Sequence, residues 1–126
     1  MQPNQASMNR TPFILAAVGA GLTSLYWTAL ALLIGVAAST GSSNPLQVIL
    51  PFVLIGLYAY RGYQVFQGEP AAANALLWLH GIGGVVSVMR MAGGDSIVIL
   101  LYGIKIALHV FGAATAFWAM KVSTTR

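Results

Sequence analysis

The sequence contains no cysteine, and only eight of its 126 residues carry a charge. The missing cysteines exclude disulfides, thiolate metal sites and thiol chemistry. Soluble proteins have roughly a quarter of their residues charged, whereas Lys, Arg, Asp and Glu make up 6% of this chain. Residues 11–60 contain no acid, no base and no histidine. This scarcity of charge excludes an ordinary soluble domain and indicates a membrane protein.

The sequence also lacks the patterns of enzymes and of nucleic-acid binders. Its formal net charge is +4, but the six basic residues are scattered and form no basic stripe. The two carboxylates, Glu69 and Asp95, are expected on opposite sides of a membrane, so they cannot act as an acid–base pair. No H-E-x-x-H motif occurs, and the glycine clusters HGIGG and MAGGD lack the spacing of phosphate loops. We predict a protein that is not an enzyme and binds no nucleic acid.

Apolar runs long enough to cross a bilayer account for most of the chain, whose mean hydropathy is +0.80. A hydrocarbon core of about 30 Å requires about 20 residues of helix. Four runs meet this length: residues 12–38, 45–66, 70–91 and 96–120. Helix-start signals stand at their N-terminal ends, namely Pro12, Pro45, Pro70 and the candidate cap Asp95. The sequence therefore predicts four transmembrane helices.

The short links between these runs make consecutive helices antiparallel neighbours. The predicted fold is all-α, with residues 1–126 forming one polytopic, up-down-up-down bundle of four transmembrane helices. The side that carries both termini collects four basic residues: Arg10, Arg61, Lys121 and Arg126. The opposite side has only Arg90 near its surface. By the positive-inside rule both termini are cytoplasmic, in a plasma membrane of the bacterial inner-membrane type.

Small residues are expected to form the contacts between the helices, because burying Leu against Leu gains little when the solvent is lipid. Pairs of small residues four apart occur in the first and fourth runs. They are Ala16 with Ala20, Ala17 with Gly21, and Gly112 with Ala116. We expect these pairs to lie on helix contact faces.

Three ionisable side chains lie well inside the predicted spans: His80, Lys105 and His109. A lysine at the centre of a membrane helix costs about 2.5–3.5 kcal/mol on insertion scales, so such groups suggest a function. At about 1.5 Å rise per residue, both histidines fall near the middle of the bilayer on adjacent helices. Helical spacing places Tyr102, Lys105 and His109 on one face, and His80 and Ser87 on a face of the preceding helix. We expect these two faces to meet.

The two histidines allow three interpretations. In the first, each imidazole bonds a neighbouring carbonyl, Ser87, Thr115 or a tyrosine and stabilises helix packing. In the second, His80 and His109 ligate a haem b or another tetrapyrrole for electron transfer. In the third, His109 and Lys105 line a proton or substrate path. We favour the packing interpretation, and the other two stay open.

Lys105 has no obvious acidic partner. Glu69 is expected on the other membrane side, and Asp95 lies ten residues away, about 15 Å along the helix. We favour a lysine stem that extends its ammonium toward the outer headgroups. Otherwise Lys105 is neutral, or another subunit, a lipid phosphate or an anionic ligand supplies the counter-charge.

The partners expected from sequence are therefore the lipid bilayer and other membrane subunits or further copies of the chain. We predict a non-enzymatic subunit or accessory component of a larger membrane complex or homo-oligomer, with Tyr102, Lys105, His109 and Ser87 as its intramembrane polar face. The alternatives are a haem b electron carrier that uses His80 and His109, or a small oligomeric transporter or channel with a path lined by Lys105 and His109.

Overall fold

Four helices make up the protein, as the sequence predicts. The computed structural model describes residues 9–39, 41 and 44–124, and within these ranges it contains no strand. The helices are α1 (Thr11–Ser39), α2 (Pro45–Phe66), α3 (Pro70–Met91) and α4 (Ser96–Thr124). The bounds of α2 and α3 are as predicted, whereas α1 and α4 extend slightly beyond residues 12–38 and 96–120. Each helix is long and apolar enough to cross a membrane.

Asn44 and Asp95 cap the starts of α2 and α4 with their side chains. Asn44 accepts a hydrogen bond on Oδ1 from the backbone N–H two residues later, at 3.0 Å, and Gln47 Oε1 accepts from the Asn44 N–H at 3.4 Å. This is a capping box. Asp95 Oδ1 accepts from the N–H of Val98 at 2.9 Å, so the predicted cap of α4 is confirmed. Glu69 precedes α3 without a side-chain cap.

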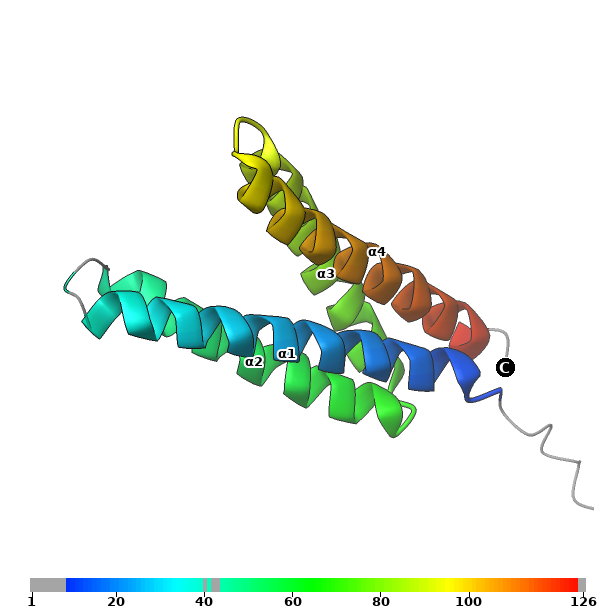
Figure 1. Cartoon of the computed structure of the whole chain (residues 1–126). Coiled ribbons are helices and arrows are strands. Elements are labelled where there is room, and N and C mark those ends of the chain that lie inside the picture. Colours follow the sequence, from blue (N-terminus) through cyan, green and yellow to red (C-terminus); the bar gives the residue numbers. More distant parts are fainter. Residues whose placement is uncertain (1–8, 40, 42–43, 125–126) are drawn as a thin grey trace, which may run out of the picture.

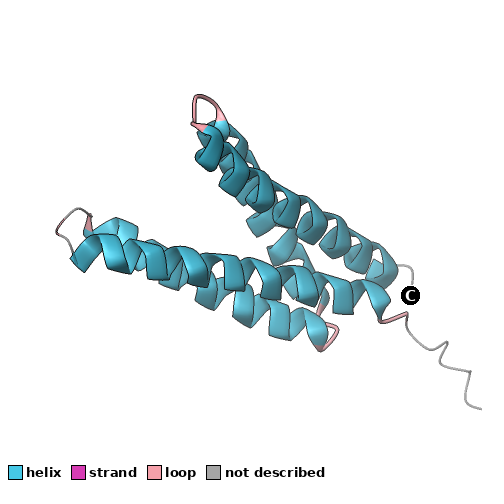
Figure 2. Cartoon of the chain, viewed as in Figure 1, coloured by secondary structure: helices cyan, strands magenta, loops and turns pink. Residues whose placement is uncertain are grey.

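The helices form two hairpins, α1 with α2 and α3 with α4, that diverge like the arms of a V (Figure 1). The hairpins converge where the α2–α3 link lies and diverge toward the α1–α2 and α3–α4 links. Figure 2 shows short loops at the α2–α3 and α3–α4 links. We call the converging part the closed end and the diverging part the open end. Arg126, counted above with the basic residues near the termini, lies outside the described residues.

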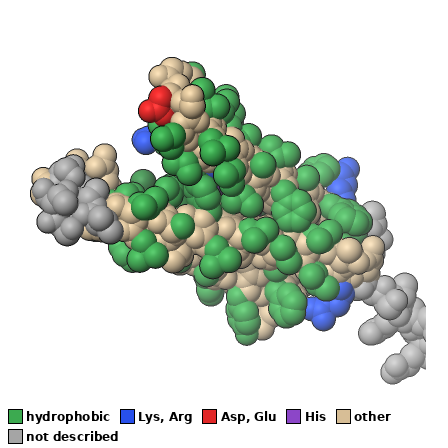
Figure 3. Space-filling view, in the orientation of Figure 1, with side chains coloured by type: hydrophobic (Ala, Val, Ile, Leu, Met, Phe, Trp, Pro, Cys, Tyr) green, Lys and Arg blue, Asp and Glu red, His purple; other side chains and the backbone are tan. Residues whose placement is uncertain are grey.

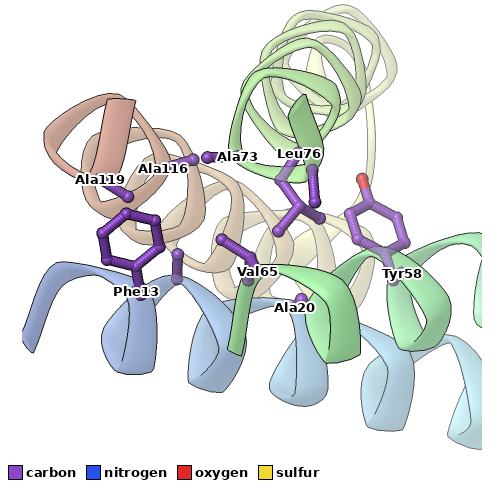
Figure 4. Packing of buried hydrophobic residues seen from close by; sticks show 10 residues of the cluster. Phe13, Ala20, Tyr58, Val65, Ala73, Leu76, Ala116 and Ala119 are labelled. Carbon is purple, nitrogen blue, oxygen red and sulfur yellow. The ribbon is translucent and has the colours of Figure 1, made fainter. Parts of the chain in front are cut away.

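Small and apolar side chains hold the closed end and the middle of the molecule together. Figure 4 shows this cluster, to which all four helices contribute: Phe13, Ala16, Ala20, Tyr58, Val65, Ala72, Ala73, Leu76, Ala116 and Ala119. A Cβ added to Gly19 would lie 3.1 Å from the Cα of Gly112, so the backbones of α1 and α4 approach closely at these glycines. A Cβ on Gly62 would lie 2.9 Å from the Cβ of Ala20, which sets the same close approach for α1 and α2.

Two of the three expected small-residue faces are contact faces. Ala16 and Ala20 are fully buried in the cluster, and Gly112 and Ala116 are also buried. Gly21 is exposed, and a Cβ placed there would meet nothing within 4 Å in the described part of the chain. The expectation for Gly21 is therefore wrong, because the contact face of α1 runs through residues one position away.

Candidate functional site

A cleft of about 620 Å³ lies between the two hairpins, and all four helices contribute to its lining. Its walls are mainly apolar, with Leu30 from α1, Leu50 and Leu54 from α2, and Ile82 and Val86 from α3. Polar groups come from Gln47, Arg90, Tyr102, Lys105 and His109. Small-molecule sites in proteins typically have volumes of about 300–1,000 Å³ and the same mixture of apolar walls and few polar groups. The cleft is thus a candidate binding site.

The polar face expected on α4 lines this cleft. Tyr102, Lys105 and His109 all belong to its lining. His80 lies directly behind His109, on the neighbouring helix α3. Ser87 is buried apart from the cleft lining and donates its hydroxyl to the carbonyl of Gly83 on its own helix, at 2.6 Å. The structure thus brings together four of the five side chains singled out from the sequence and places Ser87 in the packing between helices.

Lys105 is buried in the wall of the cleft, with 6% of its surface exposed. Its Nζ lies 4.3 Å from the centroid of the Trp27 ring and 5.4 Å from that of Tyr102. Both are cation–π distances. Sequence reasoning had favoured an ammonium extended toward the membrane surface, whereas the structure holds it against two aromatic rings. Arg90, one residue before the end of α3, supplies a second cation to the same cleft.

The two histidines bond each other. His80 Nδ1 and His109 Nδ1 are 3.1 Å apart, and the ring centroids are 5.4 Å apart. Such a bond requires one ring to carry its proton on Nδ1 and the other to accept there. Both rings are almost fully buried, and both Nε2 atoms lack a hydrogen-bond partner among the described residues. The packing interpretation had named carbonyls, hydroxyls and a tyrosine as partners, but the partner of each imidazole is the other imidazole.

Glycines make room for this pair. A Cβ added to Gly83 on α3 would lie 2.6 Å from Cε1 and 2.7 Å from Nε2 of His109. A Cβ added to Gly112 on α4 would overlap the His80 ring. Each imidazole therefore lies against the bare backbone of the opposite helix. These two glycines let α3 and α4 approach closely enough for the histidines to meet.

Tyr58 on α2 is a member of the site that sequence reasoning missed. Its ring centroid lies 4.9 Å from that of His80 and 6.2 Å from that of His109. Its hydroxyl donates to the carbonyl of Leu79 on α3 at 3.1 Å. The only signal in the sequence is spacing, because the buried residues Pro51, Tyr58 and Val65 recur every seven positions. Tyr58 joins the first hairpin to the histidine pair of the second.

The arrangement does not fit a haem held between the two histidines. An iron bound by both rings needs one nitrogen of each ring aimed at a common centre, with the macrocycle between the rings. Here the Nδ1 atoms of His80 and His109 face each other within hydrogen-bonding distance, and the Nε2 atoms lie beside Gly112 and Gly83 of the opposite helix. The small residues near the histidines accommodate the partner helix, and no gap wide enough for a porphyrin separates the rings.

Comparisons of the chain with protein-family models, with curated proteins and with solved structures find no match. The class is therefore defined by the fold and the site alone. This is an all-helical protein with four helices capable of spanning a membrane, with a cationic, largely apolar cleft between two hairpins.

Proposed function

We propose that this chain is an integral membrane protein whose four helices cross the bilayer up-down-up-down, with both termini in the cytoplasm. The closed end carries Arg10, Arg61 and Lys121, whereas the described open end has Arg90 as its basic residue near the membrane surface. This bias favours a cytoplasmic closed end. Large apolar side chains cover both hairpins and charged ones lie toward the ends (Figure 3), as expected for helices whose middle portions contact lipid.

Within the membrane, we propose a non-enzymatic role as an accessory or assembly subunit that joins other membrane subunits or further copies of itself. The observation that carries this proposal is an outward-facing glycine on every helix. These glycines are Gly21, Gly56, Gly81 and Gly103, and a Cβ on any of them would meet nothing within 4 Å among the described residues. Glycine in a helix interior costs about 1 kcal/mol relative to alanine. Glycines that serve no contact inside the chain are available for close approach of helices from another chain.

The mass of the protein after gentle extraction tests this role. We expect the full chain, extracted in a mild detergent and examined by native mass spectrometry, to have a mass above the 13.2 kDa of one copy. Gly21→Leu, Gly56→Leu, Gly81→Leu and Gly103→Leu are introduced singly, and at least one should reduce the mass to that of one chain. Ala59→Leu, at an exposed position of α2, is the matched control and should not. A wild-type protein found as a single copy with no bound subunit would overturn the proposal.

A second candidate function is a small oligomeric transporter or channel, and one observation favours it. Lys105 and His109, the residues expected to line a path, both line the cleft, which enters the molecule from the open end. The packed cluster at the closed end means that a complete path requires the hairpins to rearrange. Proton flux into liposomes, followed with an enclosed pH dye, should fall in Lys105→Ala and persist in Lys121→Ala. Unchanged flux in Lys105→Ala would remove this candidate.

A further inference from the structure

The cleft is positively charged and has no acidic group of its own. Lys105 and Arg90 both line it, and no Asp or Glu of the described residues does. The only two acids of the chain are engaged or distant: Asp95 caps α4, and Glu69 lies at the start of α3, at the closed end. An anion from outside the chain is therefore the natural counter-charge.

The aromatic contacts of Lys105 do not replace this counter-charge. The two cation–π contacts lower the cost of burying the ammonium, but they leave its positive charge without an anion. Lys105 lies nine residues from the start of α4, about 14 Å along the helix. Arg90 lies close to the end of α3. The two cations thus mark a line from the rim of the cleft into its interior.

The rest of the lining is suited to a hydrocarbon chain. Leu50 and Leu54 on one hairpin face Ile82 and Val86 on the other, and all four belong to the lining. A helix is about 10–12 Å across, so a partner helix would fill 620 Å³ within roughly one or two turns. An acyl chain is thinner and can follow the cleft along its length. The shape favours a lipid over a helix of another protein.

We propose that the cleft binds one anionic phospholipid, with its phosphate at Arg90 and Lys105 and one acyl chain between the apolar walls. The volume accommodates the headgroup region and the upper part of one chain, and the remainder of the lipid stays in the bilayer. This inference rests on the membrane placement proposed above and does not depend on assembly with other subunits. Binding is electrostatic at Arg90 and Lys105 and apolar along the other walls of the cleft.

Native mass spectrometry of the full chain with defined lipids tests the proposal. We expect a one-to-one adduct with phosphatidylglycerol at a concentration at least tenfold below that needed for phosphatidylcholine. Lys105→Met should abolish this preference while the protein stays folded, because replacing a buried charge with an apolar side chain of similar length is usually tolerated. Arg90→Gln should weaken it. Lys121→Gln, which changes an exposed cation at the closed end, is the matched control and should leave it intact.

A second variant tests the space inside the cleft without changing its charge. Val86→Trp keeps both cations but fills the space between the hairpins, and it should also prevent the adduct. Equal affinity for the two lipids, or equal loss of the preference in Lys121→Gln, would overturn the proposal. Competition by millimolar inorganic phosphate that displaces phosphatidylglycerol completely would show a site for a free anion, which also overturns the lipid assignment.

Crosslinking distinguishes a lipid from a protein occupant. Because the chain has no cysteine, Ile82→Cys introduces a single thiol into the cleft wall for a thiol-linked photoreactive probe in native membranes. A lipid adduct supports the proposal, whereas a protein adduct at this position would overturn it. The assembly mass measured above is independent of this result. If the wild-type protein bound no lipid but kept its assembly mass, the lipid site would be refuted and the proposed assembly role would stand.

Discussion

The closed end and the open end of the bundle are built from the same four helices but pack in opposite ways. At the closed end, Ala72, Ala73 and Ala119 are fully buried and bring the backbones together. At the open end, the facing residues are large, such as Leu50 and Val86, and the hairpins diverge around a cleft. Apolar residues dominate both ends, so hydrophobicity does not explain the difference. Residue size decides where the helices pack tightly and where they leave space.

The two ends also differ in where their charged groups lie. At the closed end, Arg10 and Lys121 are exposed and Arg61 is half-buried. The cleft of the open end holds Lys105 and Arg90. The histidine pair lies at the boundary between the two, behind the inner part of the cleft. The tight end therefore serves as the scaffold, and the open end offers the chemistry.

The largest expected effect comes from adding one methyl group at the tight contact of α3 and α4. Gly112→Ala places a Cβ in the volume occupied by the His80 ring, and overpacking of this kind costs about 1–3 kcal/mol. Gly103→Ala, on the same helix, meets open space and should raise the free energy of unfolding by up to about 1 kcal/mol through helix propensity. Unfolding in a mild detergent, followed by far-UV circular dichroism, measures both. Equal free energies of unfolding in Gly112→Ala and Gly103→Ala would contradict the close approach of α3 and α4.

The second prediction concerns the histidine pair, which lies at the boundary between the closed and the open end. His80→Leu and His109→Leu each leave one buried imidazole without its partner, which costs about 1–3 kcal/mol. The double variant removes both groups, so its loss of stability should be smaller than the sum of the two single losses by about 1 kcal/mol or more. The same unfolding experiment gives this coupling. Strictly additive losses would show that the His80–His109 bond contributes nothing to stability.

The helices could be predicted from sequence because their signals are local. The scarcity of charge, the prolines at the first positions of α2 and α3, and the cap Asp95 all act within a few residues of the element they define. Rise per residue also placed both histidines at the same level of adjacent helices, and the structure shows them in direct contact. Local rules thus account for the number of helices and for the meeting of the two histidines.

The rest of the site could not be predicted, because it depends on contacts between distant segments. The divergence of the hairpins follows from side-chain sizes on facing helices, and no short window of sequence contains both faces. Trp27 contacts Lys105 from the first helix, and Tyr58 contacts His80 from the second. Their positions are set by the rotation of each helix about its axis. Helical periodicity shows which residues of one helix share a face, but it does not show which neighbouring helix that face contacts. The contact partners of Lys105 and His80 are therefore found only in the three-dimensional packing.

The smallest expected effect concerns the Tyr58 hydroxyl, which links the two hairpins beside the histidine pair. Tyr58→Phe removes the hydrogen bond to the Leu79 carbonyl but keeps the ring against His80, so the free energy of unfolding should fall by about 0.5–1.5 kcal/mol. Tyr63→Phe, on the same helix, removes only an exposed hydrogen bond that the Tyr63 hydroxyl accepts from Gln67 Nε2 at 2.7 Å, so it should lower the free energy of unfolding by less. Because the Tyr58 hydroxyl is directed to a backbone carbonyl and not to a charged group, phosphatidylglycerol binding should persist in Tyr58→Phe. Tyr58 also lines the cleft, so a variant that kept full stability but lost lipid binding would show that its hydroxyl acts in the cleft and not in the scaffold.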